Sequence, residues 1–127
     1  KLGFESMRLM KFGLPISYLS LLIIIISGEN AGALHFTIYI LTSIVLTLTQ
    51  PAVALSFPTS LAGKSLTSFN LLIFVGTFIM QWGIGLIIDF CQFLGKEEVQ
   101  SFKISFTVYL IICIFSYLYF MLKNKNE

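Results

Sequence analysis

The chain alternates between long apolar runs without a single charged residue and short polar segments that hold nearly all the charges. A bilayer core of about 30 Å needs roughly 20 apolar residues at a rise of 1.5 Å each, and every run is near or above that length. The pattern therefore predicts an all-α, polytopic membrane protein with four transmembrane helices. The charge-free runs are residues 12–28, 30–63, 65–88 and 104–122.

The predicted membrane spans lie inside these runs. Pro15 falls in the first turn of the first span, where proline is tolerated. Pro51 lies within the second span and should kink that helix. The first ten residues are expected to form a loop that runs into a helix. The spans are predicted at residues 13–27, 34–57, 66–88 and 102–122, with loops at 28–33, 58–65 and 89–101.

Composition supports a membrane protein and excludes a soluble domain. Hydrophobic residues make up 57% of the chain and charged residues 11%, and the mean hydropathy is +0.92, whereas soluble domains usually carry about 25% charged residues. A soluble protein of 127 residues could not bury this much apolar surface in one core. The net charge of +2 is too small to favour a nucleic-acid partner, so the lipid bilayer is the expected environment.

The placement of basic residues predicts an orientation. Four spans put both termini on one side, and the positive-inside rule assigns the more basic side to the cytoplasm. Both termini and the 58–65 loop should therefore be cytoplasmic, in the inner (cytoplasmic) membrane of the cell. That side carries Lys1, Arg8, Lys11, Lys64, Lys123 and Lys125, whereas the other side carries Lys96 and Lys103 beside Glu29, Asp89, Glu97 and Glu98.

The four spans differ in polarity. The first and fourth are apolar on every side and are expected to face lipid, whereas the second and third each carry a polar face. An amide in hydrocarbon is costly without a partner, so these faces should meet protein or a water-filled cavity, and the second and third spans should pack centrally. The candidate cavity residues are Ser43, Thr47 and Gln50 on the second span and Asn70, Thr77 and Gln81 on the third.

Some of these residues have a second interpretation. Serine and threonine hydroxyls in membrane helices often bond to backbone carbonyls of their own helix, so Ser43 and Thr47 are either cavity residues or locally satisfied. Gly76 and Gly83 lie seven residues apart on a roughly opposite face of the third span and are predicted to pack against another helix.

Catalytic and metal chemistry find little support in the sequence. The chain has one histidine, His35, and no His-Glu-x-x-His or Ser/His/Asp set, so an enzyme, a cofactor and a metal site are not expected. Glu29 and Asp89 lie near the outer edge of their spans. Cys91 and Cys113 are far apart and are interpreted as free membrane cysteines.

Residues 51–70 and 74–89 resemble the tenth and eleventh helices of major facilitator superfamily transporters. In that family a helix often ends in Phe-Pro, a short loop carries Gly-Lys or Gly-Arg, an Asn opens the next helix, and a glycine-rich helix ends in Ile-Asp. The matching residues are Phe57-Pro58, Gly63-Lys64, Asn70, Gly76, Gly83, Gly85 and Asp89.

The resemblance implies that residues 1–127 are the ninth to twelfth helices of a twelve-helix transporter, with the ninth and twelfth peripheral and the tenth and eleventh lining a central cavity. The expected function is movement of a small solute by alternating access, with the remaining helices of the parent transporter as partners. A self-contained four-helix membrane protein that acts as an assembly or partner-binding subunit is the alternative, and a start codon directly before Lys1 would favour it. The substrate and the coupling ion are left open.

Overall fold

The computed structural model describes residues 2–124, with side chains described for residues 8–123. The described chain is helical almost throughout. The elements are α1 (Leu2–Ser27), the 3-10 turn η1 (Gly28–Asn30), α2 (Ala33–Ser43), the 3-10 segment η2 (Ile44–Leu48), α3 (Thr49–Leu55), α4 (Thr59–Phe93) and α5 (Glu98–Asn124).

Four helical segments are long and apolar enough to cross a membrane. The first runs from α1 through η1, the second combines α2, η2 and α3, the third is the whole of α4, and the fourth is most of α5. The prediction of an all-α chain with four spans is confirmed at this level, and the chain is consistent with a multi-pass membrane protein. The segments are Arg8–Asn30, Ala33–Leu55, Thr59–Phe93 and Glu98–Lys123.

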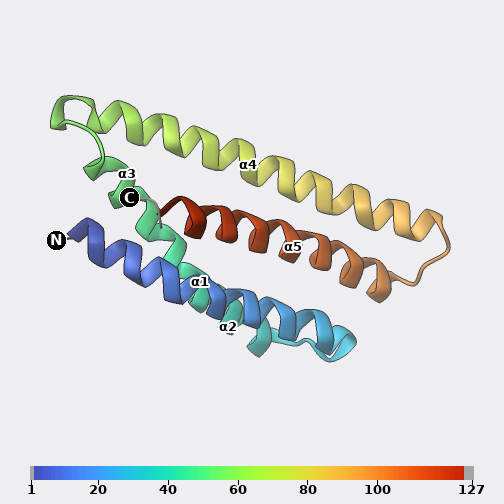
Figure 1. Cartoon of the computed structure of the whole chain (residues 1–127). Helices are drawn as coiled ribbons and strands as arrows, with labels where there is room; N and C mark the ends of the chain where they lie inside the picture. The colour runs from blue at the N-terminus through green and yellow to red at the C-terminus, as the bar shows by residue number, and fades with distance from the viewer. Residues whose placement is uncertain (1, 125–127) are drawn as a thin grey trace.

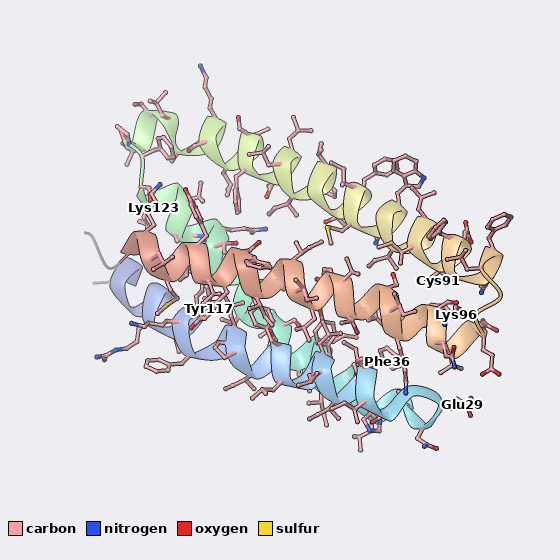
Figure 2. The ribbon with its side chains drawn as sticks, turned by 45° about the vertical axis from the view of Figure 1, so that its right-hand side comes forward. Glu29, Phe36, Cys91, Lys96, Tyr117 and Lys123 are labelled. Carbon is pink, nitrogen blue, oxygen red and sulfur yellow. The ribbon has the colours of Figure 1, made fainter. Side chains whose placement is uncertain are left out.

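Successive helices run in opposite directions, so that the turns between them gather at two ends of the bundle (Figure 1). The terminal end holds the start of α1, the end of α5 and the loop between α3 and α4. The turn end holds η1 and the loop between α4 and α5. Figure 2 shows Lys123 at the terminal end and Glu29 and Lys96 at the turn end. Lys1 and Lys125 lie outside the described residues.

The helices extend beyond the predicted spans and the loops are shorter. The predicted 58–65 loop is largely helical, because the Pro58 carbonyl accepts the amides of Leu61 and Ala62 at 2.8 and 3.0 Å and begins α4. The predicted 89–101 loop shrinks to four residues, since α4 continues to Phe93 and α5 begins at Glu98. Hydropathy marks only the lipid-facing part of a helix, whereas backbone hydrogen bonding continues into the polar flanks.

Two predictions about the first span are also wrong. α1 begins at Leu2, so residues 2–10 are helical and not the predicted loop, and Pro15 lies inside the helix instead of in its first turn. A proline inside a helix removes the bond from its own nitrogen to the carbonyl four residues earlier, which here belongs to Lys11. The Tyr117 hydroxyl of α5 donates to that Lys11 carbonyl at 2.8 Å. A neighbouring helix therefore satisfies the group that Pro15 leaves free.

The second span is interrupted near Pro51, as its sequence predicts. Pro51 is the third residue of α3, and the five preceding residues of η2 form a 3-10 segment between α2 and α3. The proline cannot donate to the Thr47 carbonyl, so the α-helical pattern fails there. Thr47 and Thr49 donate their hydroxyls to the carbonyls of Ile44 and Leu46 at 2.7 and 2.6 Å. These bonds supply local partners within the irregular turn.

The prediction that the second and third spans lie centrally is wrong for the described chain. The buried apolar residues lie mainly on α1, and α4 has a single buried residue, Cys91. α5 lies between α4 and α1 in both views (Figures 1 and 2), and it contacts both helices. The buried side chains of α1 and α5 are Met10, Leu14, Ser17, Ser20, Leu21 and Ile24, and Ser101, Ser105 and Leu110.

Small residues explain this arrangement. Ser101 and Ser105 are spaced by four on α5 and are both fully buried, and Ser105 donates to the Ile84 carbonyl of α4 at 3.1 Å. On α1, a Cβ added to Gly13 would lie 2.7 Å from a methyl carbon of Val45 in η2. Between membrane helices, close packing is favoured by small residues, not by a difference in apolarity. These small residues allow α5 to approach α4 closely, and α1 to approach η2 closely.

Candidate functional site

The predicted polar face of the second span is divided among three elements. Ser43 ends α2, Thr47 lies in η2, and Gln50 lies in α3. Ser43 is half-buried, whereas Thr47 and Gln50 are exposed. The Thr47 hydroxyl donates to the Ile44 carbonyl at 2.7 Å. This is the bond to a backbone carbonyl of its own helix that was expected if Thr47 does not line a cavity. A cavity role for Ser43 and Thr47 stays a prediction.

The predicted polar face of the third span lies on α4. Asn70 is half-buried, and Thr77 and Gln81 are exposed. Thr77 and Gln81 are four residues apart and therefore share one side of the helix. Both lie near the middle of the predicted span 66–88. At this depth of a bilayer, the exposed amide of Gln81 would face hydrocarbon unless protein or water covered it.

The structure brings only part of the predicted set together. Among the described elements, α4 contacts α3 and α5 but not α2 or η2. Gln50 and Asn70 thus lie on helices that touch, whereas Ser43 and Thr47 lie on elements that α4 does not reach. The candidate site is therefore best defined as the α3–α4 face, with Gln50, Asn70, Thr77 and Gln81 as its members.

The two predicted packing glycines have open surroundings. A Cβ added to Gly76 or Gly83 would meet no atom of the described chain within 4 Å. Neither glycine therefore packs against a helix of this chain. Gly76 lies in the stretch from residue 71 to residue 79, in which every residue of α4 is exposed. The middle of α4 is therefore exposed on all sides within the described structure.

The covered residues of α4 lie on either side of its exposed middle. Toward the terminal end, half-buried residues such as Leu66 and Phe69 lie in the part that follows α3, and toward the turn end Ile84 and Cys91 lie against α5. Both views show α4 and α5 closest at their shared turn and separating toward the terminal end (Figures 1 and 2). The face that contains Thr77 and Gln81 begins where these helices separate.

Several residues that position the helices were missed in the sequence. Ser17, Ser20, Ser101 and Ser105 are buried, and the Ser20 hydroxyl lies 3.3 Å from that of Thr42 on α2. The available signal was the spacing of four between Ser101 and Ser105, which is typical of close helix packing. For Tyr117 the signal was Pro15, since a proline in a membrane helix requires a donor nearby.

Within the described residues, no group of three or more His, Cys, Asp or Glu side chains is placed to hold a metal ion. Cys91 is buried and Cys113 is half-buried, and both are free thiols. His35 accepts the Gly32 amide on its Nδ1 at 3.2 Å, which places it at the start of α2. None of these groups gathers at the α3–α4 face.

No known protein family, curated protein or solved structure matches this chain. The resemblance of residues 51–89 to major facilitator transporters therefore stays a prediction. The polar residues that α3 and α4 expose are the remaining indication of function.

Proposed function

We propose that this chain is part of a secondary transporter of the major facilitator type, which moves a small solute by alternating access. One observation carries the proposal: Gln50, Thr77 and Gln81 are exposed on helices apolar enough to span a membrane. A primary amide in hydrocarbon without a partner is costly, so these residues require water or further protein around them. A solute pathway supplies water, and the remaining helices of a transporter supply protein.

The exposed middle of α4 supports the same proposal. Residues 71–79 are all exposed in the described chain, as expected for a helix whose neighbours belong to another part of a larger bundle. In this interpretation α5 packs between α1 and α4, and α3 and α4 turn their exposed faces to the rest of the transporter. Cytoplasmic termini and an inner-membrane location, inferred from the basic residues of the terminal end, belong to the proposal.

A cysteine accessibility experiment tests whether the α3–α4 face is wetted. Single cysteines replace Thr77, Gln81 or Ile79 in the full-length protein after Cys91 and Cys113 are changed to alanine. Ile79 is the matched control, because two residues rotate about 200° around a helix and Ile79 lies between the two test positions in depth. The readout is the rate of reaction with a charged, membrane-impermeant thiosulfonate.

The proposal predicts that Thr77→Cys and Gln81→Cys react at least about tenfold faster than Ile79→Cys, since a charged reagent reaches only water-filled regions. Equal rates at the three positions would contradict a solute pathway on this face. If all three are unreactive and become accessible only in detergent, a partner subunit covers α4, and the alternative of a self-contained helper protein is favoured instead.

A further inference from the structure

A small apolar pocket opens at the turn end, away from the α3–α4 face. It has a volume of about 210 Å³ and is formed by the end of α1, the η1 turn, the start of α2 and the start of α5. Lys103 is the one charged residue among the described residues that line it. Its apolar wall is contributed mainly by Ile24, Ile25, Phe36, Val99, Phe102 and Phe106.

The end of the Lys103 side chain lies against a glycine of the η1 turn. Gly28 has a φ of +54°, and a Cβ at this residue would overlap Cε of Lys103 and lie 2.7 Å from its Nζ. The end of the lysine side chain therefore lies directly over the η1 backbone. Gly28 suits the left-handed turn, and any larger residue there would require the flexible end of Lys103 to shift.

The Lys103 ammonium has spare capacity for hydrogen bonding. It donates to the Ile26 carbonyl of α1 at 3.5 Å, which is at the long limit for such a bond. An ammonium has three donors, so this single long contact leaves it available to a further acceptor. The acidic residues at the same end are also exposed. Glu29 lies in η1, Glu97 in the loop between α4 and α5, and Glu98 at the start of α5, and Figure 2 shows Glu29 at the outer edge of the η1 turn.

The depth of the pocket identifies the kind of acceptor. Its lining residues come from the last turn of α1, the η1 turn and the segment after it, and the first turns of α2 and α5. The ends of membrane spans lie at the level of the lipid headgroups. Lysine at this level extends its stem along apolar surface and places its charge among the headgroups. An apolar wall beside one ammonium matches an acyl chain beside one phosphate.

We propose that this pocket binds one anionic phospholipid, whose phosphate accepts from Lys103 and whose upper acyl chain packs against Phe102 and Phe106. Charge complementarity favours a lipid of net negative charge, because the choline of a zwitterionic lipid places a cation beside the phosphate and weakens its attraction to the ammonium. The apolar wall selects a lipid over a free phosphate ion. The site is independent of the proposed transport activity.

The competing explanation is that Lys103 only caps the carbonyl end of α1. Variants at two lysines, each measured in two lipids, separate lipid binding from helix capping. Wild type, Lys103→Gln and Lys96→Gln are placed in nanodiscs of phosphatidylglycerol or of phosphatidylcholine with identical acyl chains. Lys96 is the matched control because it is an exposed lysine in the turn at the same end. The readouts are the midpoint of thermal unfolding and the phosphatidylglycerol retained in native mass spectrometry.

For wild type and Lys96→Gln, phosphatidylglycerol should raise the midpoint above the phosphatidylcholine value by on the order of 3–6 °C, with one lipid retained. Lys103→Gln should lose this difference and the retained lipid, whereas Lys103→Arg should keep both. If Lys103→Gln lowers the midpoint equally in both lipids, the residue is only a cap and the proposal is wrong.

A second variant covers the case in which Lys103→Gln does not fold. Ala31 lines the pocket and has an extended backbone, so Ala31→Phe fills the space and leaves Lys103 in place. The proposal predicts that Ala31→Phe also loses the lipid-dependent difference. A full difference between the two lipids in this variant would show that the pocket does not hold the acyl chain, and would overturn the proposal.

Discussion

The paired helices α1 and α5 differ from α4 in burial although all three are apolar enough to cross a membrane. α1 carries most of the buried residues of the chain, including Leu14 and Leu21, and α5 carries fully buried serines. α4 is the longest helix, with 35 residues, and residues 71–79 at its centre are exposed throughout. Apolarity alone therefore does not determine which helix is buried.

The difference follows from how helices associate when lipid already solvates apolar side chains. Burial of another leucine gains little there, whereas close packing and hydrogen bonds between helices still contribute. α5 donates to α1 through Tyr117 and Lys103 and to α4 through Ser105. The middle of α4 offers large residues such as Phe74 and Phe78, which are 73% and 66% exposed, and has no such bond to a neighbour.

The largest effect on this comparison is expected at the contact between α5 and α4. Ser105→Leu places four carbon atoms where a fully buried serine touches α4 and should reduce the free energy of unfolding by about 1–3 kcal/mol. Ser116→Leu is the matched control on the same helix, because Ser116 is exposed, and should change it by less than about 0.5 kcal/mol. Unfolding in detergent mixtures measures both. Similar losses at the two serines would show that α5 does not depend on this contact.

Gly→Ala changes in α1 and α4 should have smaller effects on the free energy of unfolding, and these effects should be of opposite sign. Gly13→Ala would place a Cβ 2.7 Å from a Val45 methyl and should cost about 1 kcal/mol, since overpacking outweighs the gain in helix propensity. Gly76→Ala meets no atom within 4 Å and should stabilise by up to about 1 kcal/mol.

Adding Val45→Ala to Gly13→Ala should restore the lost free energy of unfolding. That recovery would show that the clash with the Val45 methyl causes the loss. Stabilisation by Gly13→Ala, or a cost for Gly76→Ala in the isolated chain, would contradict the assigned contacts of the two helices.

The smallest effect concerns the hydrogen bond across α1 and α5. Tyr117→Phe removes the donor to the Lys11 carbonyl and should cost about 0.6 kcal/mol, typical for such bonds in membrane proteins. Tyr119→Phe alters an exposed tyrosine of the same helix and should be neutral. In a Pro15→Ala background the Lys11 carbonyl regains a helical partner, so Tyr117→Phe should cost less. An unchanged cost there would mean that Pro15 is unrelated to this bond.

The candidate site was predicted only in part, for reasons that particular residues illustrate. The sequence placed Gln50 and Asn70 on neighbouring spans, and their helices do touch. It grouped Thr47 with them by periodicity, but η2 changes the helical repeat before Pro51 and lies away from α4. Gly76 and Gly83 were assigned to packing from their spacing, although their surroundings in this chain are open. Spacing defines a shared face, but it does not identify what lies opposite.

The sequence by itself determined the four apolar helices and the interruption at Pro51, because hydropathy and the missing proline amide are local properties of the chain. Only the tertiary structure decided that the buried residues lie mainly on α1 and α5, that Tyr117 reaches the carbonyl freed by Pro15, and that Lys103 lies against the Gly28 turn. The physical reason is that these contacts join residues far apart in the chain. Which helices meet depends on the fit of small residues and hydrogen-bond donors across the bundle, and no single helix specifies that fit.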